Sequence, residues 1–119
     1  MVDEKGIKVL SRLFKLISDP NRLKIIFTIG KGKKTVSEIV QETGLSQTLV
    51  SFHLRPLRES GILSTERKGA FIYYSVTESN LIDLLASLRG IGLREEERDK
   101  EMKLDCPPLA FMRQWVGEK

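Results

Sequence analysis

Apolar residues recur at helical spacing through the first part of the chain. They predict an amphipathic helix over residues 4–17 and a second helix over about residues 20–29. Asp19 and Pro20 separate the two, since Asp is a good N-cap and Pro suits the first helical position. Residues 30–34, Gly-Lys-Gly-Lys-Lys, then predict a flexible cationic loop.

The next two predicted helices are joined by a tight turn. Residues 35–38, Thr-Val-Ser-Glu, form the pattern of a capping box and start a short helix that reaches residue 43. Gly44 can take positive φ and end this helix, and Ser46 can cap the following one. Gly61 ends that second helix.

The helix before Gly61 has two different faces. Val50, Leu54 and Leu57 form an apolar stripe that predicts contact with the core. The other side carries residues that can hydrogen-bond bases or phosphates or cover a thymine methyl, namely Ser46, Gln47, Thr48, Ser51, Phe52 and Arg55. A short helix, a glycine turn and such a helix are typical of a helix-turn-helix, whose second helix enters the DNA major groove. An ordinary surface helix is the alternative.

After Gly61 the pattern changes to one rich in β-branched and aromatic residues. Residues 62–66 and 71–76 predict the two strands of a β-hairpin, with residues 67–70 at its tip. A hairpin directly behind a helix-turn-helix is a wing. Arg67 and Lys68 at the tip can reach phosphates or the adjacent minor groove.

The C-terminal part predicts one more helix and a charged extension. Thr77 or Ser79 can cap a helix over residues 81–91, whose apolar surface is too broad for one core contact. We therefore expect a homodimer built from the helices at residues 7–17 and 81–91. The predicted domain organisation is a DNA-binding and dimerisation domain over residues 1–93. Residues 94–119 follow as a solvated charged extension with an amphipathic helix near residues 109–116 that packs back on the dimer.

Length and charge narrow the class of protein. A chain of 119 residues suits one domain, and it has neither a signal-peptide core nor the roughly 20-residue apolar run of a membrane span. We expect a cytoplasmic protein. Residues 1–93 hold 14 Lys and Arg against 9 Asp and Glu, a net +5, whereas residues 94–119 hold 6 against 7. This basic body suits double-stranded DNA as the partner. The cationic loop either lies against phosphates or is a solvated turn.

Candidate chemistry is sparse. The sequence contains no Ser/His/Asp or Cys/His grouping, no phosphate-binding glycine loop and no metal-spaced cluster, so we expect no enzyme, metal site or cofactor. His53 lies beside the apolar stripe, where helix packing or DNA contact is favoured over metal ligation. Cys106, the single cysteine, is followed by proline. An inert thiol is the first interpretation, and a redox or intermolecular-disulfide role and haem or metal ligation are the alternatives.

The order of these elements and their residues resembles the ArsR family of winged-helix repressors. The matching segments are residues 16–26 (Leu-Ile-Ser-Asp-Pro-Asn-Arg-Leu-Lys-Ile-Ile), 36–39, 44–54, 57–62 and 71–75. The resemblance implies a mostly α-helical winged helix-turn-helix fold with a small β-hairpin and a terminal dimerisation helix. It also implies a homodimer that represses transcription and releases DNA on sensing an effector.

The metal sites of this family have no counterpart in the sequence. Many members sense metals through cysteines in the helix before the recognition helix, but residues 35–39 here are Thr-Val-Ser-Glu-Ile. Other members place His and carboxylates along the terminal helix, and between Ser79 and Arg89 only Asp83 is a candidate ligand. Two functions therefore remain: a sequence-specific transcriptional regulator, or a winged-helix protein-interaction module that uses the same face against protein.

Overall fold

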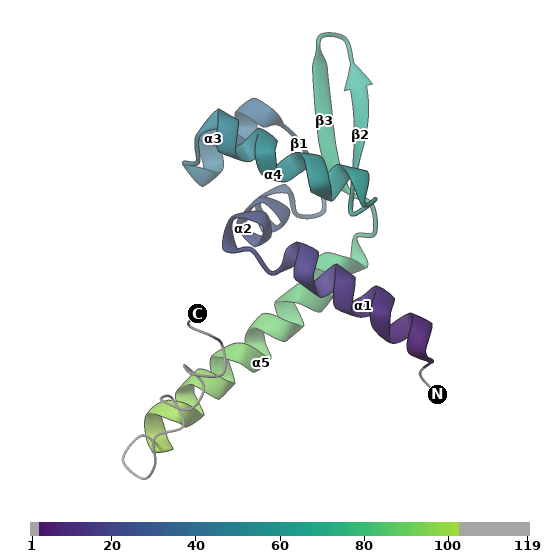
Figure 1. The fold of residues 1–119 in the computed structure, drawn as a ribbon. Coiled ribbons are helices and arrows are strands. Elements are labelled where there is room, and N and C mark those ends of the chain that lie inside the picture. The colour runs from purple at the N-terminus through teal and green to yellow at the C-terminus, as the bar shows by residue number, and fades with distance from the viewer. Residues whose placement is uncertain (1–2, 103–119) are drawn as a thin grey trace. The chain divides into compact units, whose positions relative to one another are not determined.

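The computed structural model describes residues 3–102 and shows five helices and three short strands in that range (Figure 1). In chain order these are α1 (Glu4–Ile17), α2 (Pro20–Ile29), β1 (Lys33–Thr35), α3 (Val36–Thr43), α4 (Gln47–Glu59), β2 (Leu63–Lys68), β3 (Phe71–Val76) and α5 (Asn80–Met102). The chain divides into two compact units, one ending at Ile82 and the other beginning at Asp83. The mostly helical winged helix-turn-helix fold is confirmed, with α1 to β3 in the first unit.

Side-chain caps explain where the first four helices begin. Asp3 Oδ1 accepts the Gly6 N–H at 3.0 Å, and Asp19 Oδ1 accepts the Asn21 N–H at 2.7 Å. The predicted capping box before α3 is present in both directions. The turn into α4 is formed by Gly44, whose φ of 78° places it in the left-handed region that glycine adopts without strain.

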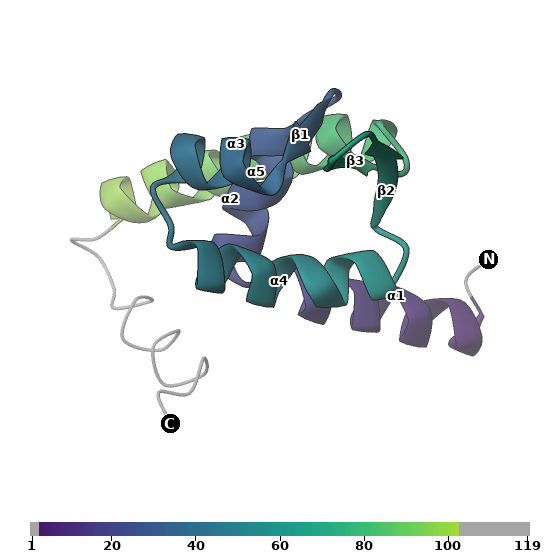
Figure 2. The same ribbon diagram turned by 90° about the horizontal axis from the view of Figure 1, so that it is seen from above.

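A three-stranded antiparallel sheet, in the order β1-β3-β2, supports the wing. Lys33 pairs with Ser75 and Thr35 with Tyr73, so β1 lies along β3 and then leads directly into α3 (Figure 2). The prediction of a flexible loop over residues 30–34 is therefore wrong for its last two residues. A three-residue strand is too short to show an alternation of its own, and it forms here through its pairing with β3.

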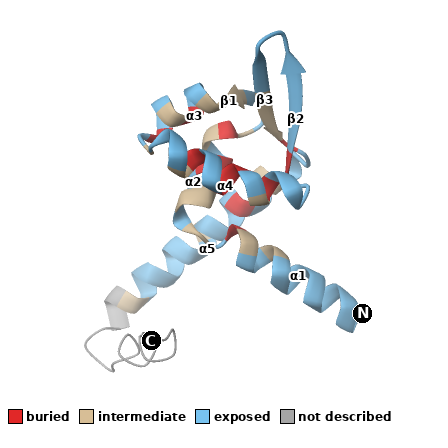
Figure 3. Ribbon diagram, turned by 45° about the horizontal axis from the view of Figure 1, so that its top comes forward, coloured by how far each residue is buried: buried red, intermediate tan, exposed pale blue. Residues whose placement is uncertain are grey.

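The core of the first unit lies between α2, α3, α4 and the base of the hairpin (Figure 3). Its buried apolar side chains are Ile17, Ile25, Ile26, Ile29, Ile39, Val50, Leu54, Leu57, Ile62, Leu63 and Val76. The predicted apolar stripe of α4 is thus confirmed as its inner face. Because α4 packs against α1, α2, α3 and β2, its outer face has a defined position.

The helix α5 is longer than the sequence pattern suggests. It continues through Gly90 and Gly92 to Met102, so the charged stretch predicted as an extension begins as helix, and residue 93 does not end an element. Its many Glu, Arg and Lys residues are good helix formers, and Arg98 pairs with Glu95 one turn away. Within residues 3–102 no helix is long and apolar enough to cross a membrane. Cys106 and the helix predicted near residues 109–116 lie outside the described residues.

Candidate nucleic-acid interface

The outer face of α4 carries the side chains that the sequence assigned to DNA contact. Ser46 serves as the N-cap, because its hydroxyl accepts the Leu49 N–H at 3.1 Å. The exposed residues that follow are Gln47, Thr48, Ser51, Phe52 and Arg55. Phe52 is 64% exposed, and the side chain of Arg55 is 75% exposed. An amide, two hydroxyls, an aromatic ring and a guanidinium therefore share one accessible helix face.

Arg55 has a partner that the sequence analysis missed. Its Nε donates to Glu59 Oε2 at 3.1 Å, one helical turn further along α4. Arg followed by Glu four residues later is the signal that could have revealed this pair. Both side chains are more than half exposed, so the pair contributes little to stability and Arg55 can exchange Glu59 for a base or phosphate.

His53 lies in the core and not on the exposed face of α4. The residue is 5% exposed, and its Nδ1 accepts a hydrogen bond from Arg22 Nε at 3.1 Å. This position corrects its inclusion among the DNA-contacting candidates and agrees with the helix-packing interpretation. Helical periodicity brings residue 53 next to Val50, Leu54 and Leu57. The imidazole can be buried there because Arg22 donates a hydrogen bond to it.

Arg22 connects the end of α1 to the recognition helix. Besides donating to His53, the guanidinium donates from Nη1 to the Leu16 carbonyl at 3.0 Å. Asp19, the N-cap of α2, lies 3.9 Å from His53 Nε2. Partial burial raises the pKa of Asp19, but hydrogen bonds from the Arg22 and Asn21 amides, together with the charge of the Arg22 guanidinium, bring it below its usual value.

The hairpin presents a basic and partly apolar tip. Gly69 has a φ of 63°, which permits the tight turn between β2 and β3. Arg67 and Lys68, which the sequence placed in the tip, are instead the last residues of β2; both are exposed and pair across the hairpin with Ile72 and Phe71. Phe71 is 59% exposed, a feature that β-propensity alone does not reveal. Cationic side chains next to an exposed ring suit a surface that meets a nucleic-acid backbone.

The lysines of the predicted cationic loop are engaged within the protein. Lys33 Nζ lies 2.7 Å from Glu66 Oε1, and Lys34 Nζ lies 2.9 Å from Glu42 Oε2. The hydrogen bond between Lys33 and Glu66 raises the pKa of Lys33 and lowers that of Glu66. These pairs tie β1 to β2 and to α3, so the two lysines do not form a free cationic loop.

Among residues 3–102 no group of three or more His, Cys, Asp or Glu side chains is close enough to hold a metal ion. The exposed face of α4 and the tip of the hairpin together carry hydrogen-bonding, cationic and aromatic side chains. This geometry defines a winged helix-turn-helix regulator.

Comparison with known proteins gives the same class. The sequence profile described as "Bacterial regulatory protein, arsR family" matches residues 19–65, from the cap of α2 into β2. A probable mercury resistance operon repressor of Streptomyces lividans is 35% identical over 96 residues, which cover 81% of this chain and 73% of that protein. A biofilm growth-associated repressor of Xylella fastidiosa is 35% identical over 95 residues, covering 80% of this chain and 83% of the relative.

Solved structures agree with these sequence relatives. The crystal structure of the transcriptional repressor BigR from Xylella fastidiosa matches with a TM-score of 0.67 and 36% identity, over 74% of this chain and 90% of that one. The chain belongs to the ArsR family, a family of DNA-binding transcriptional repressors.

Proposed function

We propose that this protein is a homodimeric repressor that binds an inverted-repeat operator, with α4 in the major groove and the β2–β3 wing on the adjacent backbone. The exposed face of α4 supports this proposal most directly, since it gathers Gln47, Thr48, Ser51 and Arg55 on one side of a helix whose other side is buried. Gln and Arg can each make two hydrogen bonds to one base edge, which is how a helix reads sequence in the major groove.

Two exposed apolar surfaces support the homodimer. On α1, Ile7, Leu10 and Phe14 are 54%, 49% and 47% exposed. On α5, the apolar residues between 47% and 60% exposed are Leu84, Leu88, Ile91 and Leu93. Burial of such area is favourable by ~25 cal/mol per Å², and a two-fold dimer would present two recognition helices. Two-fold-related helices match an operator with inverted half-sites.

The test is a salt titration of DNA binding. The DNA is the region upstream of the protein's own gene, searched first for an imperfect inverted repeat, and random DNA of the same length is the control. We expect tight binding to the inverted repeat with an affinity that falls steeply as salt rises, since phosphate contacts release counterions. Equal and weak binding to both DNAs would contradict the proposal.

The second candidate is a protein-interaction module that uses the same face. Phe52, 64% exposed in the middle of that face, favours it, because aromatic residues are enriched at protein interfaces. The salt titration separates the two candidates, since a protein-docking face predicts only weak DNA binding without sequence preference.

A further inference from the structure

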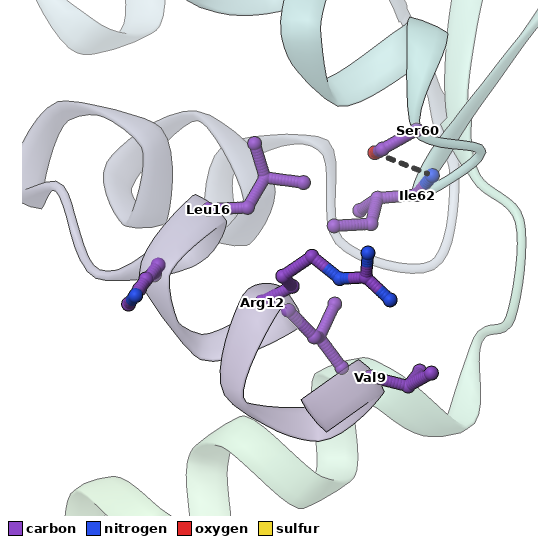
Figure 4. Close-up of a pocket in the computed structure, with 7 residues that line it drawn as sticks. Val9, Arg12, Leu16, Ser60 and Ile62 are labelled. Atoms are coloured by element: carbon purple, nitrogen blue, oxygen red, sulfur yellow. Dashed lines mark hydrogen bonds between the residues drawn. The ribbon is translucent and has the colours of Figure 1, made fainter. Parts of the chain in front are cut away.

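A groove lies between α1 and the junction of α4 with β2 (Figure 4). Its volume is about 590 Å³. Val9, Leu13 and Leu16 line it from α1, and Ile62 lines it from the junction. In Figure 4 the side chains of Leu16 and Ile62 extend toward each other across the groove. Sites for small organic molecules are mostly apolar and have volumes of roughly 300–1,000 Å³, so this groove can accommodate one.

The charge in this groove is entirely positive. Arg12 and Lys15 line it together with the apolar residues, and no Asp or Glu does. Within residues 3–102 neither cation has an ion-pair or hydrogen-bond partner for its side chain. The remaining polar group, the Ser60 hydroxyl, already donates to the Leu57 carbonyl at 3.0 Å. Apolar walls with two unpartnered cations complement a molecule that has an apolar body and a single anionic group.

The groove is separate from the proposed dimer surface. The exposed stripe of α1 consists of Ile7, Leu10 and Phe14, whereas the groove uses Val9, Leu13 and Leu16. At about 100° per residue these two sets point roughly a third of a turn apart around the helix. A partner helix that packs on the first stripe alone would therefore leave the groove residues of α1 uncovered.

We propose that this groove binds an amphipathic organic carboxylate as the effector of the protein. The carboxylate would lie at Arg12, with Lys15 adding positive charge to the same lining, and the apolar body would lie along Leu13, Leu16 and Ile62. Residues 60–62 join the end of α4 to the start of β2, so a ligand held between them and α1 acts where the recognition helix meets the wing. Contact with DNA requires α4 and the wing to keep their relative positions. Ligand binding at the residues that join them therefore lowers the affinity for DNA. Only this last step rests on the proposed function.

The first experiment measures ligand binding to the full-length protein without DNA. Decanoate, kept below micelle formation, is compared by calorimetry and thermal denaturation with decanol, decyltrimethylammonium and acetate. Decanoate binds and raises the melting temperature, while the neutral, cationic and short analogues bind at least about tenfold more weakly, because each lacks one of the two complementary parts. Absence of decanoate binding, or equal binding of decanol, overturns the proposal.

Variants locate the site. The double substitution Arg12→Gln and Lys15→Gln lowers the decanoate affinity at least about tenfold. The double substitution Lys5→Gln and Lys8→Gln, which also removes two positive charges from α1 but outside the groove, leaves it unchanged. Val9→Trp, at a residue that is 49% exposed, fills the groove and also blocks binding without disturbing the core. Circular dichroism confirms folding of each variant. If the Arg12→Gln and Lys15→Gln double variant binds decanoate as tightly as the wild type does, the proposed site is wrong.

The last experiment tests whether decanoate changes the affinity of the protein for operator DNA. Decanoate lowers the operator affinity of the wild type but not that of the double variant, and operator DNA lowers the decanoate affinity by the same factor. An operator affinity that is unchanged at saturating decanoate overturns the regulatory role. If no DNA binds even without decanoate, the proposed function fails, whereas the DNA-free measurements still decide whether the groove is a carboxylate site.

Discussion

At the scale of single residues, the sequence predicted which side chains of α4 face outward but not what they contact. Helical periodicity is a local property, and it correctly placed Val50 inside and Ser51 outside. The hydrogen bond from Arg22 to His53 joins residues 31 positions apart, so it depends on how α2 and α4 pack. No local pattern contains that information, and the burial of His53 could not be separated beforehand from a position at the edge of the exposed face.

Substitutions on α4 and on the wing should affect DNA binding differently. Gln47→Ala and Arg55→Ala should reduce the preference for the operator over random DNA, with ~1–3 kcal/mol for each good bidentate base contact. Arg67→Ala and Lys68→Ala should weaken binding to both DNAs alike, because phosphate contacts carry no sequence information. Competition assays at one salt concentration measure both effects. Unchanged specificity after both α4 substitutions would show that another face enters the groove.

Loss of Arg22 should destabilise the first unit. Arg22→Ala removes the donor to His53, whose side chain is 6% exposed, and leaves a buried acceptor unsatisfied at a cost of about 1–3 kcal/mol. Lys24→Ala, an exposed position on the same helix, is the matched control and should change stability by less than about 0.5 kcal/mol. Urea denaturation measures the free energy of unfolding of both variants. Equal stability of the two variants would mean that the Arg22 hydrogen bonds contribute nothing.

At the scale of elements, starts and turns were predictable where a side chain or glycine controls them locally. The capping box at Thr35 and the left-handed Gly44 set the limits of α3 from within a few residues. The strand β1 was missed because it exists through pairing with β3, which lies far along the sequence. The continuation of α5 was missed because two glycines lower helix propensity without necessarily ending a helix.

A β-carbon at Gly44, in the turn between α3 and α4, should lower the stability of the protein even though there is space for it. Gly44 has a φ of 78°, and a methyl group at this position would meet no atom within 4 Å beyond the adjacent residues. Gly44→Ala should therefore destabilise the protein by about 1 kcal/mol through backbone strain alone. Gly92→Ala, equally free of neighbours within 4 Å but inside α5, should stabilise the helix by about 0.5–1 kcal/mol. Chemical denaturation followed by circular dichroism measures the two changes in the free energy of unfolding, which should have opposite signs. The same sign for both would refute the conformational explanation.

At the scale of the whole molecule, the exposed apolar residues of α1 and α5 argue for a second copy. A monomer rarely leaves this many large apolar side chains in water. We expect a dimer at micromolar concentration by sedimentation equilibrium, and Phe14→Glu or Leu88→Glu should shift it toward monomer. Lys8→Glu, an exposed charge reversal on α1, is the control for charge alone. A wild-type monomer at micromolar concentration would contradict the proposal.

The response of the DNA affinity to metals is a separate prediction, because one relative is named for mercury resistance. We expect the DNA affinity of this protein to be unaffected by zinc, cadmium, nickel or trivalent arsenic. Both sites known in the family lack their ligands here, and one thiol per chain cannot complete a soft-metal coordination sphere.

Two chains in a dimer supply two Cys106 thiols, so the test of the metal prediction includes a variant without this cysteine. Operator DNA is titrated with wild type and Cys106→Ser in the presence of each metal, haemin and an oxidant. A metal response that persists in Cys106→Ser would refute the prediction, since it would require ligands outside the thiol. A haem or oxidant response lost in Cys106→Ser would instead assign Cys106 a ligand or redox role, because thiolates bind soft metals and are oxidised readily.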